Sequence, residues 1–236
     1  MAGKGSRFAD AGYKIPKPLI KFNGKMMIEH VLDSFISLEE EIKFVLIVRE
    51  DFLTEWSAEI DHLRSSYNIT FVVAKKITQG ASCSVLLARD LFKDTSLLVA
   101  DSDTFYEPVV ISEFLKFIKS TKAEQSLITF KSQKNCYSYI AINNGNVLIA
   151  EKRVISEHAI SGIYFFKYSK DFTDAAIEAL IYGEKDHGEY YMSKVFWLAS
   201  KLRGNFVNFY EISSKELFCT GTPEQLKEVL ERLNKN

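Results

Sequence analysis

The chain has 236 residues, of which 47% are hydrophobic and 26% charged, an ordinary composition for one folded α/β domain. Its net charge of −1 excludes a general nucleic-acid or membrane-surface binder, and its longest apolar runs are far too short to span a bilayer. The cysteines (Cys83, Cys136 and Cys219) match neither a disulfide framework nor a zinc site, and residues 1–20 contain no apolar signal segment. We therefore expect a cytoplasmic protein.

Helical spacing and strand-like runs of apolar residues alternate along the chain. The first part predicts a helix at 26–37, a strand at 43–50, a helix at 52–66, a strand at 69–74, a helix at 81–92, a strand at 96–101 and a helix at 109–120. The second part predicts strands at 126–132, 136–143, 146–152 and 159–167, helices at 171–182 and 189–202, a strand at 205–212 and a helix at 223–234. The alternation favours βαβ units and a parallel sheet, and the run of strands favours an antiparallel addition to it.

A basic, glycine-rich segment, MAGKGSRF, opens the chain. Gly3 and Gly5 allow positive φ and a close approach of the backbone to a ligand, and the free N–H groups of such a turn hold phosphate oxygens. Lys4 and Arg7 would add positive charge, and Arg7 could supply a fork of donors. By itself the segment favours the alternative of a solvated tail with incidental glycines.

A lysine held between two prolines follows this loop. Pro16 and Pro18 fix φ on both sides of Lys17, so this lysine has little backbone freedom. The joint pattern, MAGKGSRF…PKPLI…GKMMIEHVL, resembles the signature of the nucleotidyltransferase superfamily that includes sugar-1-phosphate nucleotidylyltransferases. It is most similar to members found in bacterial surface-polysaccharide synthesis, among them a capsular CTP:phosphoglutamine cytidylyltransferase.

The resemblance implies a fold and a reaction. The fold is α/β, with a three-layer, Rossmann-like, mixed and mostly parallel sheet related to that of GT-A glycosyltransferases. Residues 1–236 would form a single domain, with a nucleotide-binding half at 1–122 and an acceptor-binding half at 123–236. The reaction moves NMP, and CMP from CTP in the most similar members, onto phosphoglutamine or a sugar phosphate, and it releases pyrophosphate. It uses Mg²⁺ and involves neither nucleic acid nor membrane; a homodimer is compatible with it.

The resemblance also assigns residues to the nucleotide. The opening loop would hold the triphosphate through Ala2, Gly3, Lys4, Gly5 and Ser6, with Arg7 and Lys17 as the catalytic cations. The segment ITQGASCSVLLA resembles the base-reading element, in which Gln79, Gly80 and Ser84 would meet the nucleobase. An ordinary helix N-terminus is the alternative interpretation of that segment.

Asp101 and Asp103 follow the apolar run SLLVA, at the end of a predicted strand. Two carboxylates in this position suit a hard divalent ion, although an acidic turn is the alternative. The resemblance implies that Asp103 holds Mg²⁺, with Asp101 as second ligand or orienting group. In many family members an aspartate precedes the TGTP motif as a further ligand. Here that residue is Cys219, and a neutral thiol binds Mg²⁺ poorly, which leaves the second ligand in question.

Two residues are assigned to the acceptor by the same resemblance. Lys152, in the segment AEKR, would be a catalytic residue that binds the acceptor phosphate, and Glu189 would lie near the acceptor. An exposed strand end and a plain amphipathic helix are the alternatives. A GT-A-type glycosyltransferase that uses Asp101-Ser102-Asp103 as its metal motif is the main competing function, although the opening loop and PKP argue against it. A regulatory homologue that binds nucleotide is less favoured, because Arg7, Lys17 and Asp103 are all present.

The family normally has an apolar strand directly before the glycine loop. Here the loop begins at Met1, so we expect the first strand of the fold to be missing from this sequence. We expect such a strand upstream of Met1, and we expect a chain that is longer by about six to eight residues to be more stable.

Overall fold

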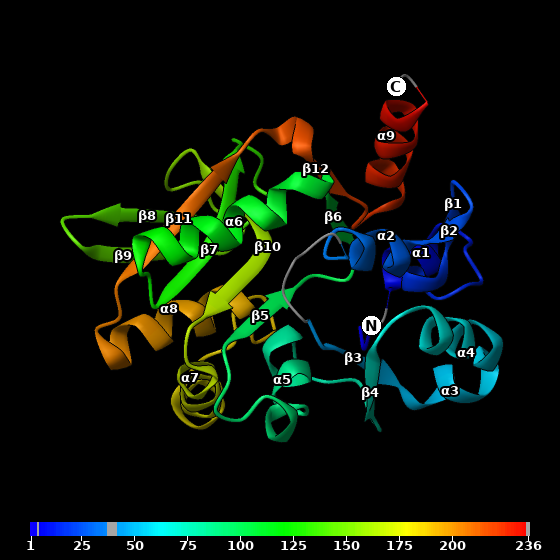
Figure 1. The fold of residues 1–236 in the computed structure, drawn as a ribbon, viewed down its shortest axis with the longest axis horizontal. Helices are drawn as coiled ribbons and strands as arrows, with labels where there is room; N and C mark the ends of the chain where they lie inside the picture. Colours follow the sequence, from blue (N-terminus) through cyan, green and yellow to red (C-terminus); the bar gives the residue numbers. More distant parts are fainter. Residues whose placement is uncertain (4, 37–41, 235–236) are drawn as a thin grey trace. The chain divides into compact units, whose positions relative to one another are not determined.

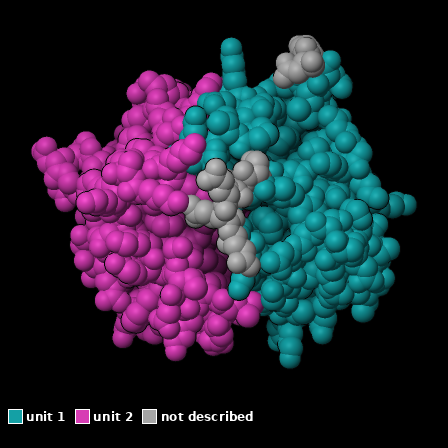
Figure 2. Space-filling view, in the orientation of Figure 1, with its two compact units in different colours: residues 1–77, 101–113, 215–236 teal, residues 78–100, 114–214 magenta. Residues whose placement is uncertain are grey.

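The computed structural model describes residues 1–3, 5–36 and 42–234. They form two compact units, which Figure 2 shows in different colours: unit 1 comprises residues 1–77, 101–113 and 215–236, and unit 2 comprises residues 78–100 and 114–214. The units differ from the expected halves, because segments far apart in the sequence fold together in unit 1. The assignment of nucleotide and acceptor to the two halves stays a prediction. Among the described residues, no helix is long and apolar enough to cross a membrane.

Unit 1 contains one of the predicted βαβ units. Strands β3 (Phe44–Arg49) and β4 (Ile69–Ala74) pair in parallel, as expected from their positions. The helix predicted at 52–66 is instead two helices, α3 (Glu50–Glu55) and α4 (Ser57–Ser66), because Trp56 leaves the helical region at φ −127° and ψ 36°. Helix α2 (Met27–Asp33) is shorter than predicted, although residue 37 of the prediction lies outside the described part of the chain.

The remaining elements of unit 1 are short except for the last helix. They are α1 (Ser6–Asp10), the 3-10 helix η1 (Lys17–Leu19), β1 (Lys21–Phe22), β2 (Lys25–Met26), the 3-10 helix η3 (Ser214–Glu216), which begins just before this unit's last segment, and α9 (Pro223–Leu233). The predicted cap of α9 is confirmed: Thr222 Oγ1 accepts a hydrogen bond of 3.2 Å from the Gln225 N–H.

A two-stranded ribbon in unit 1 was not predicted. Strand β6 (Thr104–Tyr106) pairs antiparallel with β12 (Leu217–Cys219), so that Cys219 lies opposite Thr104. The rings of Phe105 and Phe218 stack with centroids 4.7 Å apart. This pairing brings the TGTP motif to the residues that follow β5 (Leu97–Ala100), and it therefore builds the candidate site.

Unit 2 is built on a six-stranded mixed sheet in the order β11-β7-β10-β8-β9, with β5 also paired to β10 (Figure 1). The strands are β5 (Leu97–Ala100), β7 (Gln125–Lys131), β8 (Tyr139–Asn143), β9 (Asn146–Ala150), β10 (His158–Phe166) and β11 (Val207–Ile212). Because β10 is antiparallel to three neighbours, four of the six strands (β5, β7, β8 and β11) run in one direction. The predicted α/β class with a mixed sheet of mostly parallel direction is confirmed.

Helices cover both faces of this sheet. On one face Phe196 of α8 (Met192–Arg203) and Phe172 of α7 (Ser169–Tyr182) pack on Phe166 of β10. On the other face Phe114 of α6 (Pro108–Thr121) packs near Tyr210 of β11. The expected three-layer arrangement is therefore present within unit 2, and Figure 1 shows these helices beside their strands. The helix predicted at 81–92 is only α5 (Ala81–Leu86) followed by the 3-10 helix η2 (Arg89–Leu91).

Candidate active site

Two buried side chains, Ala2 and Phe8, hold the glycine loop of unit 1 against the protein. Ala2 and Phe8 are buried, and the Gly5 carbonyl accepts hydrogen bonds from the N–H groups of Phe8 (3.1 Å) and Ala9 (3.2 Å). Gly5 has φ 63°, a left-handed conformation that glycine adopts without strain. The side that faces solvent carries Gly3, Ser6 and Arg7, all of them exposed. Lys4, also assigned to the loop, lies outside the described residues.

Lys17 and Asp103 form an ion pair, although they are far apart in the sequence. The Lys17 ammonium also donates a hydrogen bond of 3.2 Å to the Gly221 carbonyl and lies 5.7 Å from the centre of the Phe8 ring. Both side chains of the pair are largely shielded, with 17% and 26% of their surface exposed. The structure thus brings together the braced lysine, the glycine loop through Phe8, and the aspartate after β5.

The TGTP motif fixes the position of Asp103 through two hydrogen bonds to its backbone carbonyl. The Asp103 carbonyl accepts two hydrogen bonds of 2.7 Å, from the N–H and from the hydroxyl of Thr220. A Cβ on Gly221 would lie 3.7 Å from Asp103 Oδ2 and 3.7 Å from Cys219 Sγ, so the carboxylate and the thiol flank the same glycine. Sequence reasoning compared only Cys219 with the family pattern and missed Thr220 and Gly221, although the quoted motif contains both.

Cys219 stays a thiol in this environment. Burial, and next the Asp103 carboxylate, raise the pKa of Cys219 to about 11. A protonated thiol is a poor ligand for a hard ion, whereas carboxylates suit it. Asp101 is exposed just before Asp103. The oxygen donors of Asp103 and Asp101, together with water and substrate phosphate, therefore fit Mg²⁺, and Cys219 adds nothing to that set.

In unit 2 the predicted base-reading segment packs against the loop before α8. The Tyr190 N–H donates to the Gln79 carbonyl (2.8 Å), and the buried Ser82 hydroxyl donates to the Tyr190 carbonyl (2.8 Å). Gly80 has φ 142°, and a Cβ there would lie 2.7 Å from the Tyr190 nitrogen. Only glycine fits at this position, because the two backbones are in contact.

The other two residues of this segment differ in exposure. The Gln79 side chain is exposed. The Ser84 hydroxyl is instead bonded to the Thr78 hydroxyl (2.6 Å) and donates to the Gly80 carbonyl (3.3 Å). Ser84 therefore bonds back to the preceding turn from within α5, and this helix has no side-chain cap hydrogen bond.

Lys152 is held in a defined place by a tyrosine that sequence reasoning missed. Its ammonium donates to the Tyr191 hydroxyl (2.9 Å) and lies 5.3 Å from the centre of the Tyr191 ring. Lys152 itself has φ 49°, an uncommon conformation for a residue with a side chain. Its neighbour Glu151 is buried and accepts hydrogen bonds from Ser138 (2.5 Å) and Ser193. This buried carboxylate ties the Lys152 turn to the first turn of α8.

Glu189 lies in a tight turn before that helix. Its N–H and carbonyl bond to Asp186 (3.0 and 3.1 Å) across His187 and Gly188, both of which have positive φ. The Glu189 side chain is exposed. The same loop therefore carries Glu189, the Tyr190 backbone that meets Gly80, and the Tyr191 hydroxyl that meets Lys152.

The sequence matches a known protein family over most of its length. Residues 1–198 match the model of the nucleotidyl transferase family. The chain belongs to that family. The match favours nucleotidylyl transfer over the glycosyltransferase alternative, whereas the finer resemblance to a capsular cytidylyltransferase stays a prediction.

Relatives align over part of their length. The chain is 28% identical over 116 residues to the bifunctional protein GlmU of Methanocaldococcus jannaschii, which covers 49% of this chain and 26% of that protein. It is 24% identical over 178 residues to mannose-1-phosphate guanyltransferase of Gibberella zeae, which covers 72% of this chain and 48% of that protein. The matched part of the chain thus spans only about a quarter of the length of the first relative and about half of the length of the second.

Solved structures align over nearly the whole chain. The nucleoside-diphosphate-sugar pyrophosphorylase of Vibrio cholerae RC9 has a TM-score of 0.84 at 23% identity and covers 98% of both chains. The inositol-1-phosphate CTP transferase of T. maritima has a TM-score of 0.74 at 18% identity, covering 99% of this chain and 92% of that one. At these identities the likeness shows the fold.

Proposed function

We propose that this protein is a nucleotidylyltransferase that moves a nucleotidyl group, CMP from CTP by preference, onto a phosphorylated acceptor and releases pyrophosphate. The observation that carries the proposal is the Lys17–Asp103 pair beside the glycine loop, which combines a shielded ammonium with a carboxylate in one place. A transferred phosphoryl group needs both, because its oxygens must be neutralised while a metal ion is held.

The chemistry asks little of the protein beyond positioning and charge. An ionised phosphate oxygen of the acceptor attacks the α-phosphate in line, so neither a general base nor a covalent nucleophile is needed. Lys17 and the exposed Arg7 would neutralise the α- and β-phosphates, and the backbone N–H groups from Ala2 to Ser6 would hold the triphosphate. Mg²⁺, held by Asp103 with Asp101, supplies polarisation of the α-phosphate when bound.

Unit 2 would supply the recognition groups. The exposed Gln79 side chain and the backbone at Gly80 would meet the base, and Lys152, oriented by Tyr191, would bind the acceptor phosphate. Glu189 would lie near the acceptor on the same loop. Because the Ser84 hydroxyl is already bonded to Thr78, its part in choosing cytosine would act through the shape of the turn. Phosphoglutamine and sugar phosphates are the proposed acceptors, in surface-polysaccharide synthesis.

One assay tests the reaction. The protein is incubated with Mg²⁺, each NTP in turn, and phosphoglutamine, inositol 1-phosphate or a panel of sugar 1-phosphates, and pyrophosphate release is measured. We expect release with CTP and one class of acceptor. No release with any pair would sink the proposal, and release of a nucleoside diphosphate from a nucleotide sugar would favour a glycosyltransferase.

Variants test the residues. Asp103→Asn and Lys17→Met should each lower kcat by roughly 100-fold or more, because each removes charge stabilisation from the transferred phosphate. Lys25→Gln is the matched control: Lys25 is an exposed lysine of the same unit, paired with Asp33 at 2.6 Å. Its kcat should equal that of the unmodified protein. Unchanged rates in both site variants would contradict the assignment.

A further inference from the structure

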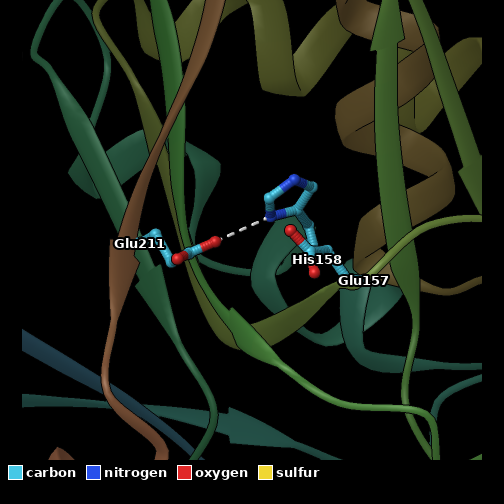
Figure 3. Close-up of side chains that lie close together, drawn as sticks. All are labelled: Glu157, His158 and Glu211. Carbon is cyan, nitrogen blue, oxygen red and sulfur yellow. Dashed lines mark ion pairs between the residues drawn. The ribbon is translucent and has the colours of Figure 1, made fainter.

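A histidine and two glutamates gather at one edge of the unit 2 sheet. His158 begins β10 and lies opposite Lys131 of β7, while Glu211 of β11 lies opposite Thr129 of β7. Since side chains alternate along a strand, His158, Lys131, Thr129 and Glu211 all project from the same face of the sheet. Glu157 precedes His158 directly, and Figure 3 shows the two carboxylates, of Glu157 and Glu211, close to the imidazole ring of His158.

The distances among these groups are those of metal ligands. One ligand atom each from Glu157, His158 and Glu211 lies within 4.8 Å of the other two. His158 Nδ1 is 2.9 Å from Glu211 Oε2. Two atoms bound about 2.1 Å from one ion lie about 3.0 Å apart at right angles and about 3.4 Å apart in a tetrahedron.

The contact between His158 and Glu211 is not an ordinary hydrogen bond. In the part of the chain that the structure describes, the Nδ1 atom is buried and has no hydrogen-bond partner, so the carboxylate oxygen lies out of line with a ring N–H. Neighbouring ligands of one ion have this relation, because each points at the metal rather than at the other.

A second buried polar atom beside this cluster also lacks a partner. Thr129 is fully buried, and within the described residues its hydroxyl makes no hydrogen bond. Buried hydroxyls are normally satisfied, and Thr129 is the direct cross-strand neighbour of Glu211. A water on a metal ion at this edge of the sheet would give the hydroxyl a partner.

We propose that Glu157, His158 and Glu211 bind a divalent transition-metal ion of the zinc class, with a further position open to water. An imidazole nitrogen with two carboxylates suits zinc and its neighbours, whereas Mg²⁺ prefers oxygen alone. The ion would join the start of β10 to β11 across β7. Nothing in the proposed transfer reaction uses these residues.

Lys131 is the competitor for this site. Its ammonium lies 3.2 Å from Glu157 and 4.0 Å from Glu211, and the hydrogen bond to Glu157 raises the pKa of Lys131. Without metal this cation balances the two carboxylates. Its side chain is exposed and flexible, so it can withdraw when an ion binds.

Calorimetric titration of the chelator-treated full chain with Zn²⁺ tests the site. A Cys136→Ser background removes the exposed thiol, which would otherwise bind zinc itself. We expect one equivalent to bind, and His158→Gln and Glu211→Gln to weaken that binding by roughly tenfold or more. His62→Gln is the control: His62 also pairs with a glutamate, at 2.8 Å, but among the described residues it belongs to no three-ligand cluster.

Lys131→Gln separates a metal site from a purely structural cluster. It should bind Zn²⁺ several-fold more tightly, because the competing ammonium is gone, and Zn²⁺ should raise its Tm as it does for the unmodified protein. Glu211→Gln should show no such rise. The proposal is overturned if the unmodified chain binds no equivalent, or if Glu211→Gln and Lys131→Gln both bind with unaltered affinity.

Discussion

Replacing Gly80 with alanine should damage unit 2 far more than a typical glycine substitution does. Gly80 has φ 142°, and an added Cβ would lie 2.7 Å from the Tyr190 nitrogen and 2.9 Å from its carbonyl carbon. Real Cβ atoms do not approach backbone this closely. The two backbones must therefore move apart, and both belong to segments that we assign to substrate recognition.

The size of the effect follows from the contacts that are lost. Forcing alanine into this backbone conformation costs about 1–3 kcal/mol. Separation also breaks the bond from the Tyr190 N–H to the Gln79 carbonyl and that from the Ser82 hydroxyl to the Tyr190 carbonyl, each worth about 1 kcal/mol. The free energy of unfolding should fall by about 3–5 kcal/mol.

Gly204→Ala is the matched control. Gly204 also has positive φ, 66°, but a Cβ there would meet nothing within 4 Å. The left-handed backbone conformation alone should lower the free energy of unfolding of this variant, by about 1–2 kcal/mol. Urea unfolding of both variants measures the difference, and the KM values should rise only for Gly80→Ala. If the two variants unfold at the same urea concentration, the close approach at Tyr190 does not matter and the reasoning is refuted.

Four further results are expected. The contribution of Cys219 to the free energy of unfolding should be fully present below about pH 9 and should be lost towards about pH 11. The reason is that the folded state keeps the Cys219 proton (pKa about 11), whereas the unfolded chain, with an ordinary pKa of 9.0, loses it at lower pH. Cys219→Ser should therefore flatten this part of a pH profile measured by urea unfolding. Cys219→Asp should lower the Mg²⁺ concentration that gives half-maximal pyrophosphate release, because it adds an oxygen ligand. Tyr191→Phe removes the acceptor of the Lys152 hydrogen bond and should raise the acceptor KM roughly fivefold, leaving the NTP KM unchanged. Thr222→Ala should lower the free energy of unfolding by about 1 kcal/mol in urea, through loss of the bond to the Gln225 N–H.

Long periodic segments of the fold could be predicted from the sequence, and short ones could not. Strand β4 has the predicted bounds, 69–74, because a run of branched apolar residues marks it clearly. Strands β6 and β12 have three residues each and owe their pairing to contacts across about half the chain. No local pattern encodes such a pairing. The break at Trp56 was also missed, because the apolar spacing typical of a helix continues through it.

The candidate site divides in a similar way. Residues whose side chains carry the proposed chemistry, such as Lys17 and Asp103, could be named from motif and charge, and the structure brings these two together. The residues that position them act through backbone or through tertiary contact. The Thr220 hydroxyl donates a hydrogen bond to the Asp103 carbonyl, and the Tyr191 hydroxyl accepts one from Lys152, which lies in another segment. Thr220 belongs to the TGTP motif, but the contacts that Thr220 and Tyr191 make become visible only in the fold.

The protonated thiol of Cys219 limits the negative charge beside the Lys17–Asp103 pair. With a protonated thiol at this position, the Asp103 carboxylate pairs with the Lys17 ammonium, and Cys219 adds no charge to the pair. An aspartate in place of Cys219 would put two carboxylates beside one ammonium, and their repulsion would have to be relieved by Mg²⁺. In this chain Cys219 adds no further carboxylate to the pair. If Asp103 holds Mg²⁺ as proposed, the Lys17 ammonium would be available to the substrate phosphates.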